Sequence, residues 1–311
     1  MKISHFSYGR LFLMFFLVVP AGRLAAESSD TDALQPSAEK GDAKSQYELA
    51  RRYEKGTGVG QDYSKAFTLL RQSAEQRYAP AESQLGYFYG KGLGVAKNPA
   101  EALNWYRKAA DDGNAVAQFA IGNFYSTGQQ VARDPIEAKN WWRKAAEQNN
   151  MEAQYILGYA CYEETRGGST NAAVAAEAAK WLQKAADQGH SGAMNDLGLL
   201  YEEGVGAKAD LTEALRWYRA AAERGDVKAQ STLGSFYLDG RGVPSDLVQA
   251  YVWFKLSAAN GSGVGRKYLI DYKQKELLNP AQLAEADKLF KEYQGKFATN
   301  RSASIKLGRT N

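Results

Sequence analysis

A segment of 36 residues recurs along this chain, and this repetition constrains the fold more than any other feature of the sequence. Successive copies align on a leading alanine, with five steps of 36 residues and one step of 40. A fixed period in this range is typical of solenoids, in which each unit packs only on its neighbours and the whole array is one long domain. The aligned frames start at Ala38, Ala74, Ala110, Ala146, Ala186, Ala222 and Ala258.

The first half of each frame predicts an α-helix that ends at a glycine turn. Counting the leading alanine as position 1, position 8 is small, position 12 is Leu or Ile, and position 16 is Tyr or Cys in the first six frames. A spacing of four places these side chains on one helix face. Position 13 is Gly in five frames, and because Gly costs about 1 kcal/mol in a helix, its recurrence indicates close packing. Turns such as GLGV (92–95) and GRGV (240–243) follow.

The second half of each frame predicts another helix with its own start signals. Asn98-Pro99-Ala100-Glu101 and Asp134-Pro135-Ile136-Glu137 each place a capping side chain before Pro and put Glu at the third helical position. Small, large and small residues then follow along one stripe, and the large residue is Trp in five frames. These Trp side chains are expected in the core. The predicted fold is all-α, a right-handed α-solenoid of stacked antiparallel helix pairs.

The pattern A-x-A-Q-x-x-L-G-x-x-Y, followed by a glycine turn and A-x-x-W-x-x-K-A-A, resembles the Sel-one-like repeat, a relative of the tetratricopeptide repeat. The resemblance covers residues 38–257, as in AVAQFAIGNFYSTGQQVARDPIEAKNWWRKAA (115–146). It implies six repeats and a C-terminal capping unit at 258–293, within an array that spans 38–293. Such repeats generally act as adaptors for other proteins. Exported members linked to penicillin binding carry a Cys pair in each repeat, and this chain has none, so no activity transfers.

The two ends of the chain differ from the array. Residues 1–26 read as a cleavable signal peptide, with a basic start, the apolar run LFLMFFLVV (11–19) and a small-residue site before Glu27. The apolar run is too short to span a bilayer, so we expect a periplasmic or secreted protein with no transmembrane anchor after cleavage. Residues 294–311 are basic and polar, and we expect a disordered tail.

Charge and residue types argue against nucleic acid binding and catalysis. Removing Lys2, Arg10 and Arg23 from the 39 Lys and Arg leaves 36, against 35 Asp and Glu, so no basic excess points to nucleic acid. Beyond the signal there is one histidine, His190, and one cysteine, Cys161. These are too few for a metal site of His and Cys ligands. We expect no enzyme activity, cofactor, metal or catalytic residue. A cell-wall hydrolase remains the alternative, since two carboxylates distant in the sequence can meet in the fold and act as a catalytic pair.

The remaining candidate is a surface on the first helices of the pairs. Positions 10, 14 and 17 lie away from the 8-12-16 stripe and carry aromatic rings, a pattern that suits a groove for peptide or glycan. Partial burial between neighbouring helices explains the same pattern. The predicted binding residues are Tyr47, Tyr87, Phe119, Tyr155, Tyr159 and Tyr162, with Arg51 and Asn123 as polar contacts.

These observations predict an exported scaffold that binds another protein or a peptide segment, in the envelope or at a host surface. The alternative is a peptidoglycan- or glycan-binding accessory, or a cell-wall enzyme. One further feature is an insertion of four residues in the frame of Ala146, where EETRGGSTNAAV (163–174) replaces the glycine turn. A tolerated loop is the simpler interpretation, and a binding edge is the other.

Overall fold

The computed structural model describes residues 31–167, 171–206 and 208–307 of the chain. Within these ranges the regular elements are helices and there is no strand, which confirms the all-α prediction. The chain forms two compact units, Met1–Asp112 and Gly113–Asn311, called here the N-terminal unit and the C-terminal unit. The predicted signal peptide at 1–26 lies outside the described residues.

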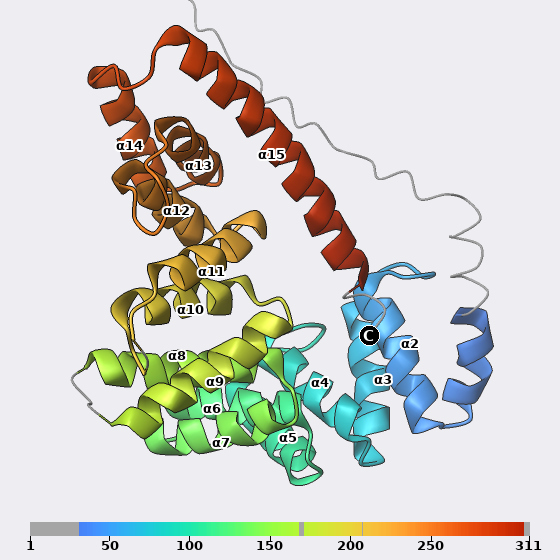
Figure 1. Ribbon diagram of the computed structural model, residues 1–311. Helices are drawn as coiled ribbons and strands as arrows, with labels where there is room; N and C mark the ends of the chain where they lie inside the picture. The colour runs from blue at the N-terminus through green and yellow to red at the C-terminus, as the bar shows by residue number, and fades with distance from the viewer. Residues whose placement is uncertain (1–30, 168–170, 207, 308–311) are drawn as a thin grey trace, which may run out of the picture. The chain divides into compact units, whose positions relative to one another are not determined.

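The N-terminal unit contains two antiparallel helix pairs (Figure 1). Helix α2 (Ala43–Lys55) packs against α3 (Tyr63–Glu75), and α4 (Ala79–Lys91) packs against α5 (Pro99–Asp111). Contacts between α3 and α4 join the two pairs. A further helical segment at 31–39 precedes α2.

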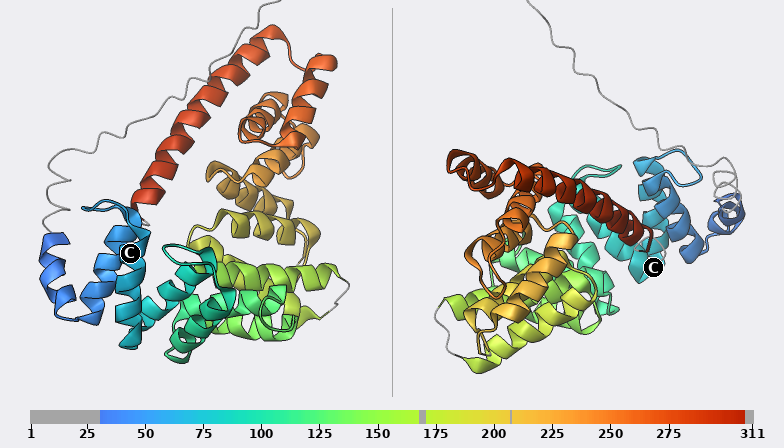
Figure 2. Two further views of the ribbon diagram at one scale, coloured as in Figure 1. Left: turned by 180° about the vertical axis from the view of Figure 1, so that it is seen from behind. Right: turned by 45° about the horizontal axis from the view of Figure 1, so that its top comes forward.

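The C-terminal unit continues the same arrangement and closes it with a long helix, coloured red in Figures 1 and 2. Each helix packs on the next from α6 to α14, and α15 packs back on α13. The helices are α6 (Ala115–Thr127), α7 (Pro135–Glu147), α8 (Met151–Arg166), α9 (Ala172–Asp187), α10 (Ser191–Glu203), α11 (Leu211–Glu223), α12 (Val227–Asp239), α13 (Leu247–Ala259), α14 (Gly263–Gln274) and α15 (Pro280–Leu307). In the part of the chain that the model describes, no helix combines the length and apolar character that crossing a bilayer requires.

The helices begin and end where the capping residues predict. Asn98 Oδ1 accepts from the Glu101 N–H at 3.1 Å, and Asp134 Oδ1 accepts from the N–H groups of Ile136 and Glu137 at 3.0 Å each. At the opposite end, glycines such as Gly92 (φ 76°) take the left-handed conformation. These caps satisfy backbone groups that a helix terminus would otherwise leave without a partner.

The recurrent glycine of the first helix marks a close contact inside each pair. A Cβ built on Gly122 would lie 2.4 Å from Trp142 Cδ1, and one on Gly198 would lie 2.6 Å from Tyr218 Cε1. The packing reason inferred from the sequence is therefore confirmed. The residue that fills the space is not the repeated Trp but its C-terminal neighbour. This position carries Leu70, Tyr106, Trp142, Leu182, Tyr218 or Phe254, and all six side chains are buried.

A buried glutamine of the first helix forms a second recurrent contact, which we call the amide rung. Gln230 Nε2 donates to the carbonyl of Ala222 in the preceding repeat at 3.1 Å, and its Oε1 accepts from Asn260 at 3.0 Å. The same side-chain pair joins Gln46 to Gln76 (2.8 Å), Gln118 to Gln148 (2.8 Å) and Gln154 to Gln188 (2.7 Å). Each rung satisfies a polar group inside the packed stack.

The C-terminal end differs from the prediction in one respect. Asn279 and Gln282 exchange backbone-to-side-chain hydrogen bonds of 3.0 Å, so α15 begins with the expected capping box. The helix then runs through the segment expected to be a disordered tail from residue 294, as far as Leu307. Phe297 explains the difference, because its ring stacks on Trp253 at 5.9 Å and is only 5% exposed. Phe297 thus anchors the start of a segment whose composition is mostly polar.

Candidate functional site

Three of the predicted binding residues lie in the N-terminal unit. Tyr47 and Arg51 contact each other, whereas the ring of Tyr87 is exposed. Tyr47 is half-buried, meets the Tyr78 ring edge-on at 5.5 Å, and accepts a hydrogen bond from Arg51 Nη1 at 2.9 Å. Tyr87 is 40% exposed, and its ring centroid lies 6.4 Å from that of Phe88. Of these three side chains, Tyr87 has the largest surface open to a partner.

Three predicted residues of the C-terminal unit are used in packing. Phe119 is half-buried against the core. Asn123 Oδ1 accepts from Trp142 Nε1 at 3.0 Å and so fixes the ring that faces Gly122. Tyr162 is 1% exposed, and its hydroxyl donates to Glu203 Oε2 at 2.8 Å. At these three positions the structure agrees with the alternative interpretation of the sequence, in which the side chains are buried between neighbouring helices.

The other two predicted residues lie together with His190 and with two polar residues of α10. Tyr155 and Tyr159 on α8 have ring centroids 6.2 Å apart, and His190 stacks on Tyr155 at 4.1 Å. Helix α10 contacts α8 and carries Asp196, whose Oδ1 accepts from Asn195 Nδ2 at 3.0 Å. We call this cluster the Tyr155 patch and define it as Tyr155, Tyr159, His190, Asn195 and Asp196.

Asp196 is the unusual member of the Tyr155 patch. It is 6% exposed, and its Oδ2 has no hydrogen-bond partner among the described residues. Burial raises the pKa of its carboxyl to about 6, although Asn195, Lys228 and the neighbouring Tyr155 favour the ionised form. A buried oxygen without a donor is costly. The patch therefore combines a buried acceptor that lacks a donor with the ring of Tyr159, which is 38% exposed.

His190 has a structural task in addition to its contact with Tyr155. Its Nδ1 accepts from the Ala193 N–H at 3.0 Å, so the imidazole serves as the N-cap of α10. Asp42, Asn114, Asn150 and Asp226 hold the same position in other frames. Alignment of these capping residues was the signal in the sequence that could have revealed the role of His190. No comparable pattern marks Asp196, because its position carries unrelated residues in the other frames.

Because His190 caps α10 with a titratable imidazole, the stability of the folded protein should depend on pH through this residue. Burial lowers the pKa of its imidazole, and Glu152 opposes that effect only in part. The unfolded chain then binds a proton more readily, so this contribution to stability is fully present above the unfolded pKa of about 6.5 and is lost as the pH falls from there through the lower pKa of the folded state. Replacing His190 with Asn keeps a capping oxygen and removes the titration.

We therefore expect wild type to lose stability relative to His190→Asn by about 1 kcal/mol between pH 7.5 and pH 5. Thermal unfolding of both proteins, followed by circular dichroism at each pH, measures the difference. His190→Ala is the control that removes the cap at both pH values. A wild-type-to-Asn difference that does not change with pH would contradict the titrating cap.

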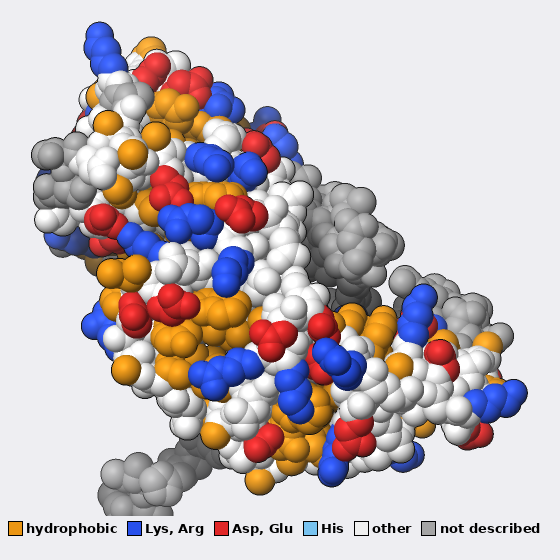
Figure 3. Space-filling view, turned by 90° about the horizontal axis from the view of Figure 1, so that it is seen from below, with side chains coloured by type: hydrophobic (Ala, Val, Ile, Leu, Met, Phe, Trp, Pro, Cys, Tyr) orange, Lys and Arg blue, Asp and Glu red, His pale blue; other side chains and the backbone are white. Residues whose placement is uncertain are grey.

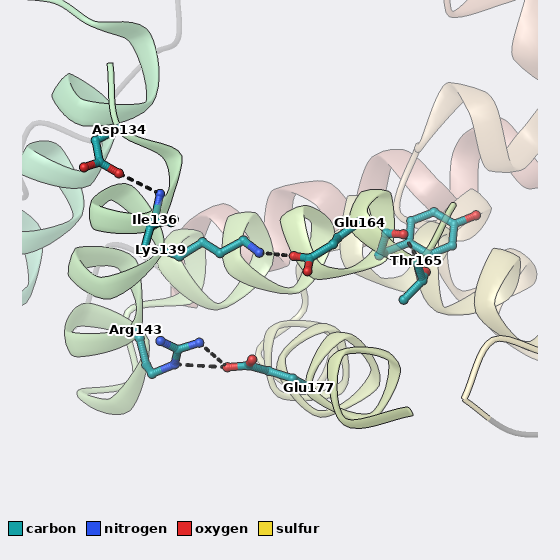
Figure 4. Close-up of polar contacts among 8 residues, drawn as sticks. Asp134, Ile136, Lys139, Arg143, Glu164, Thr165 and Glu177 are labelled. Carbon is teal, nitrogen blue, oxygen red and sulfur yellow. Dashed lines mark hydrogen bonds and ion pairs between the residues drawn. The ribbon is translucent and has the colours of Figure 1, made fainter. Parts of the chain in front are cut away.

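The four-residue insertion lengthens helices rather than forming a long loop. Both α8 and α9 have 16 residues, where the first and second helices of the other repeats have 13. Lys139 pairs with Glu164 of the lengthened α8, and Arg143 donates to Glu177 Oε1 through Nε (3.0 Å) and Nη2 (2.8 Å), as Figure 4 shows. The described residues of the insertion therefore lie mostly at the ends of α8 and α9, and α7 contacts both helices through ion pairs.

The surroundings of Cys161 do not activate its thiol. The thiol is 1% exposed, and burial raises its pKa to about 11, with a further contribution from Glu177. A thiol in such surroundings stays protonated and is a poor nucleophile. Among the described residues, no three His, Cys, Asp or Glu side chains converge as metal ligands. Over the face shown in Figure 3, basic and acidic side chains are interspersed with apolar ones.

Known proteins share both the repeat and the fold. The family model of the Sel1 repeat matches residues 43–78, 79–114, 115–150, 152–190, 191–226 and 227–262, so each matched repeat starts at or next to the first residue of a first helix. The six matches confirm the number of repeats, with boundaries five or six residues later than the leading alanines. A comparison with curated protein sequences finds no significant match.

Two solved structures are similar over most of this chain. One is a protective antigen of uropathogenic Escherichia coli strains that displays an SLR fold, with 35% identity and a TM-score of 0.81 over 90% of this chain. The match covers 59% of that protein, so this chain spans little more than half of its length. The other is a Sel1 repeat protein from Oxalobacter formigenes, with 34% identity and a TM-score of 0.66, over 81% of this chain and 96% of that one. The chain belongs to the Sel1 repeat family.

Proposed function

We propose that this chain is an exported, non-catalytic scaffold that holds a protein or peptide partner on the Tyr155 patch, in the cell envelope or at a host surface. Sel1 repeats generally mediate protein–protein interactions, and Sel1 repeat proteins are generally non-catalytic scaffolds. The signal-like residues 1–26 support export, and so does the similarity to a protein described as a protective antigen.

The buried carboxylate of Asp196 is the observation that carries the proposal. Its Oδ2 has no hydrogen-bond partner among the described residues, and the carboxyl interacts electrostatically with Tyr155 and Tyr159. A partner that donates to this oxygen would remove an unfavourable buried acceptor. Tyrosine supplies a large contact area at low cost in side-chain entropy, which suits a protein interface. A main-chain N–H or a basic side chain of a peptide provides the donor.

A photo-cross-linking residue placed at Tyr159 tests the contact in the native host. We expect a discrete adduct that depends on Asp196 and is lost in the Asp196→Asn variant. The matched control places the same residue at Tyr63, a tyrosine of similar exposure at 36% in the N-terminal unit. The adduct is identified by mass spectrometry, and the partner is then purified and its affinity measured. An affinity that does not change in Asp196→Asn would overturn the assignment of the patch.

The same cells report on export and on the glycan alternative. Fractionation and N-terminal sequencing show whether the chain leaves the cytoplasm and begins at Glu27. Incubation of the purified protein with peptidoglycan and with a chromogenic β-lactam tests the accessory or enzyme function. Retention on peptidoglycan that requires Tyr159, or β-lactam turnover, would replace the protein-binding scaffold with that alternative.

A further inference from the structure

Two repeats lack the amide rung: the repeat of α10 and α11, where Met194 replaces the glutamine, and the repeat of α4 and α5, where carboxylates take its place. Glu82 stands at the position of Gln46, and Asp112 stands at the position of Gln76, in the repeat formed by α4 and α5. An amide pair joins a donor to an acceptor, whereas two ionised carboxylates offer only acceptors and repel each other. The N-terminal unit therefore holds two like charges where the preceding repeat has a hydrogen bond.

Glu82 is buried in this position with one carboxylate oxygen that receives no hydrogen bond from the residues that the structure describes. The residue is 2% exposed, and its Oε2 has no hydrogen-bond partner among the described residues. Burial raises the pKa of its carboxyl, Asp112 raises it further, and Lys108 and Arg77 act in the opposite direction. A buried carboxylate needs a cation or several donors to be stable. The contacts in the structure leave one of its oxygens without either.

Glu82 and Asp112 line the same cavity, whose volume is about 420 Å³. Four carboxylates and two basic side chains surround it, together with an indole and a methyl group: Glu75, Glu82, Asp111, Asp112, Arg77, Lys108, Trp105 and Ala74. The basic side chains offset the charge of the pair only in part. Lys108 Nζ lies over the Trp105 ring at 3.7 Å from its centroid, and Arg77 Nη2 is 3.7 Å from Asp112 Oδ1 with a side chain that is 81% exposed.

The residue type at Arg77 also differs from that in the other repeats, although the backbone conformation is shared. Arg77 has a φ of 62°, in the left-handed region, whereas the same position is glycine in five other frames, as at Gly41 and Gly189. A non-glycine residue in this conformation costs about 1–2 kcal/mol. This repeat thus keeps a strained arginine at the rim of the cavity, beside Asp112.

We propose that this cavity binds one organic cation, a guanidinium or primary ammonium group, with Glu82 and Asp112 as its counter-charges and the Trp105 indole as one wall. Carboxylates bind guanidinium and ammonium groups through charge-assisted hydrogen bonds, and an indole face attracts the same cations. The site lies within the N-terminal unit and does not depend on the Tyr155 patch. Failure of either proposal therefore leaves the other unaffected.

Nuclear magnetic resonance of the indole N–H provides the measurement, because Trp105 is the only tryptophan of the N-terminal unit. The probe is Nα-acetyl-arginine amide, and Nα-acetyl-citrulline amide is its uncharged counterpart of nearly the same shape. Nα-acetyl-lysine amide tests the ammonium group. Methylguanidinium represents a free small cation, in contrast to an arginine carried by a protein. A Trp105→Phe variant assigns the resonance.

We expect saturable shifts of the Trp105 resonance with the arginine or lysine probe, and none with the citrulline probe. In the double variant Glu82→Gln/Asp112→Gln the affinity should fall by at least about tenfold, the loss expected for a hydrogen bond to a charged group. This variant restores the side chains found at Gln46 and Gln76, so the fold should be retained. Glu39→Gln, an exposed change in the same unit, is the control and should bind as wild type.

Two outcomes would overturn the assignment. The first is the absence of a saturable shift with every cationic probe. The second is an affinity that is the same for the citrulline probe or for the folded double variant, because binding would then not use the carboxylate pair. A tighter interaction with the acetylated arginine than with methylguanidinium identifies a protein side chain as the natural occupant, and the reverse order identifies a free small cation.

Discussion

The Gly122→Ala variant is expected to be less stable than wild type by about 1–3 kcal/mol, although alanine is the better helix former. The new Cβ would lie 2.4 Å from Trp142 Cδ1 and 3.1 Å from the carbonyl oxygen of Ala138. The indole cannot turn away freely, because its Nε1 donates to Asn123 Oδ1 at 3.0 Å. The two helices must therefore move apart, and a well-packed core resists such a movement.

Thermal unfolding followed by circular dichroism measures this loss, at about 2–4 °C for each kcal/mol in a protein of this size. Gly90→Ala is the matched control, because Gly90 is also helical and its new Cβ would meet only Ala102 Cβ at 3.7 Å, an ordinary contact. We expect Gly90→Ala to be neutral or slightly stabilising. Equal midpoints for Gly122→Ala and Gly90→Ala would show that the glycine is not required for close packing.

The Asp196→Asn variant is expected to be more stable than wild type at pH 7 by about 1–2 kcal/mol. The raised carboxyl pKa of about 6, compared with 3.8 in the absence of these interactions, corresponds to a penalty of about 3 kcal/mol for the buried charge. Asparagine removes this charge and keeps an oxygen to accept from Asn195. Its new buried N–H₂ group offsets part of the gain, by about 1 kcal/mol.

The pH dependence of this difference has a definite sign. Between about pH 6 and pH 4 the folded state binds more protons at Asp196 than the unfolded state does, so acidification stabilises the wild type through this group. The advantage of Asp196→Asn should therefore be full at pH 7 and shrink as the pH falls through about 6. Urea unfolding at both pH values measures it, with the exposed Asp239→Asn as control. An asparagine variant that is less stable than wild type at pH 7 would show that Asp196 stabilises the fold.

Most of the array could be predicted from the sequence because its signals are local and recur six times. Each cap, such as Asp134 before Pro135, acts within one turn of helix, and each glycine turn needs only its own left-handed conformation. A repeated local signal therefore specifies helix ends and the period of the stack. The 40-residue repeat misled the interpretation, because its extra residues continue both helices and the sequence of the insertion reads as a loop.

The contacts between helices were harder to predict, since adjacent positions can both be apolar. Trp141 and Trp142 follow one another, and the periodicity alone does not say which ring meets Gly122. The structure assigns that contact to Trp142 because the second helix of each pair has neighbours on two sides. The disordered tail was inferred from composition, which gives no weight to a single anchoring side chain such as Phe297.

The candidate site was the least predictable part. Tyr155 and Tyr159 could be proposed because an aromatic residue on a face outside the core is conspicuous. Tyr162 was proposed for the same reason and is nevertheless buried, because its hydroxyl donates to Glu203 of another helix. Asp196 depends on burial between α8 and α10 and on a missing donor, and both properties exist only once the helices are packed.

The amide rung has a consequence for how the length of such a protein can change during evolution. In the four repeats that carry it, the rung joins a glutamine to an amide side chain of the same helix pair, and Gln46, Gln154 and Gln230 also donate to a carbonyl that precedes the pair. A complete copy of such a repeat can therefore be duplicated or excised without leaving a polar group unpaired at the new junction. A slip of one residue would misplace every glutamine at once and leave their amides inside the stack without partners. Growth and shortening by whole units are thus favoured over gradual insertion, and sister proteins of different lengths can arise from one ancestral gene.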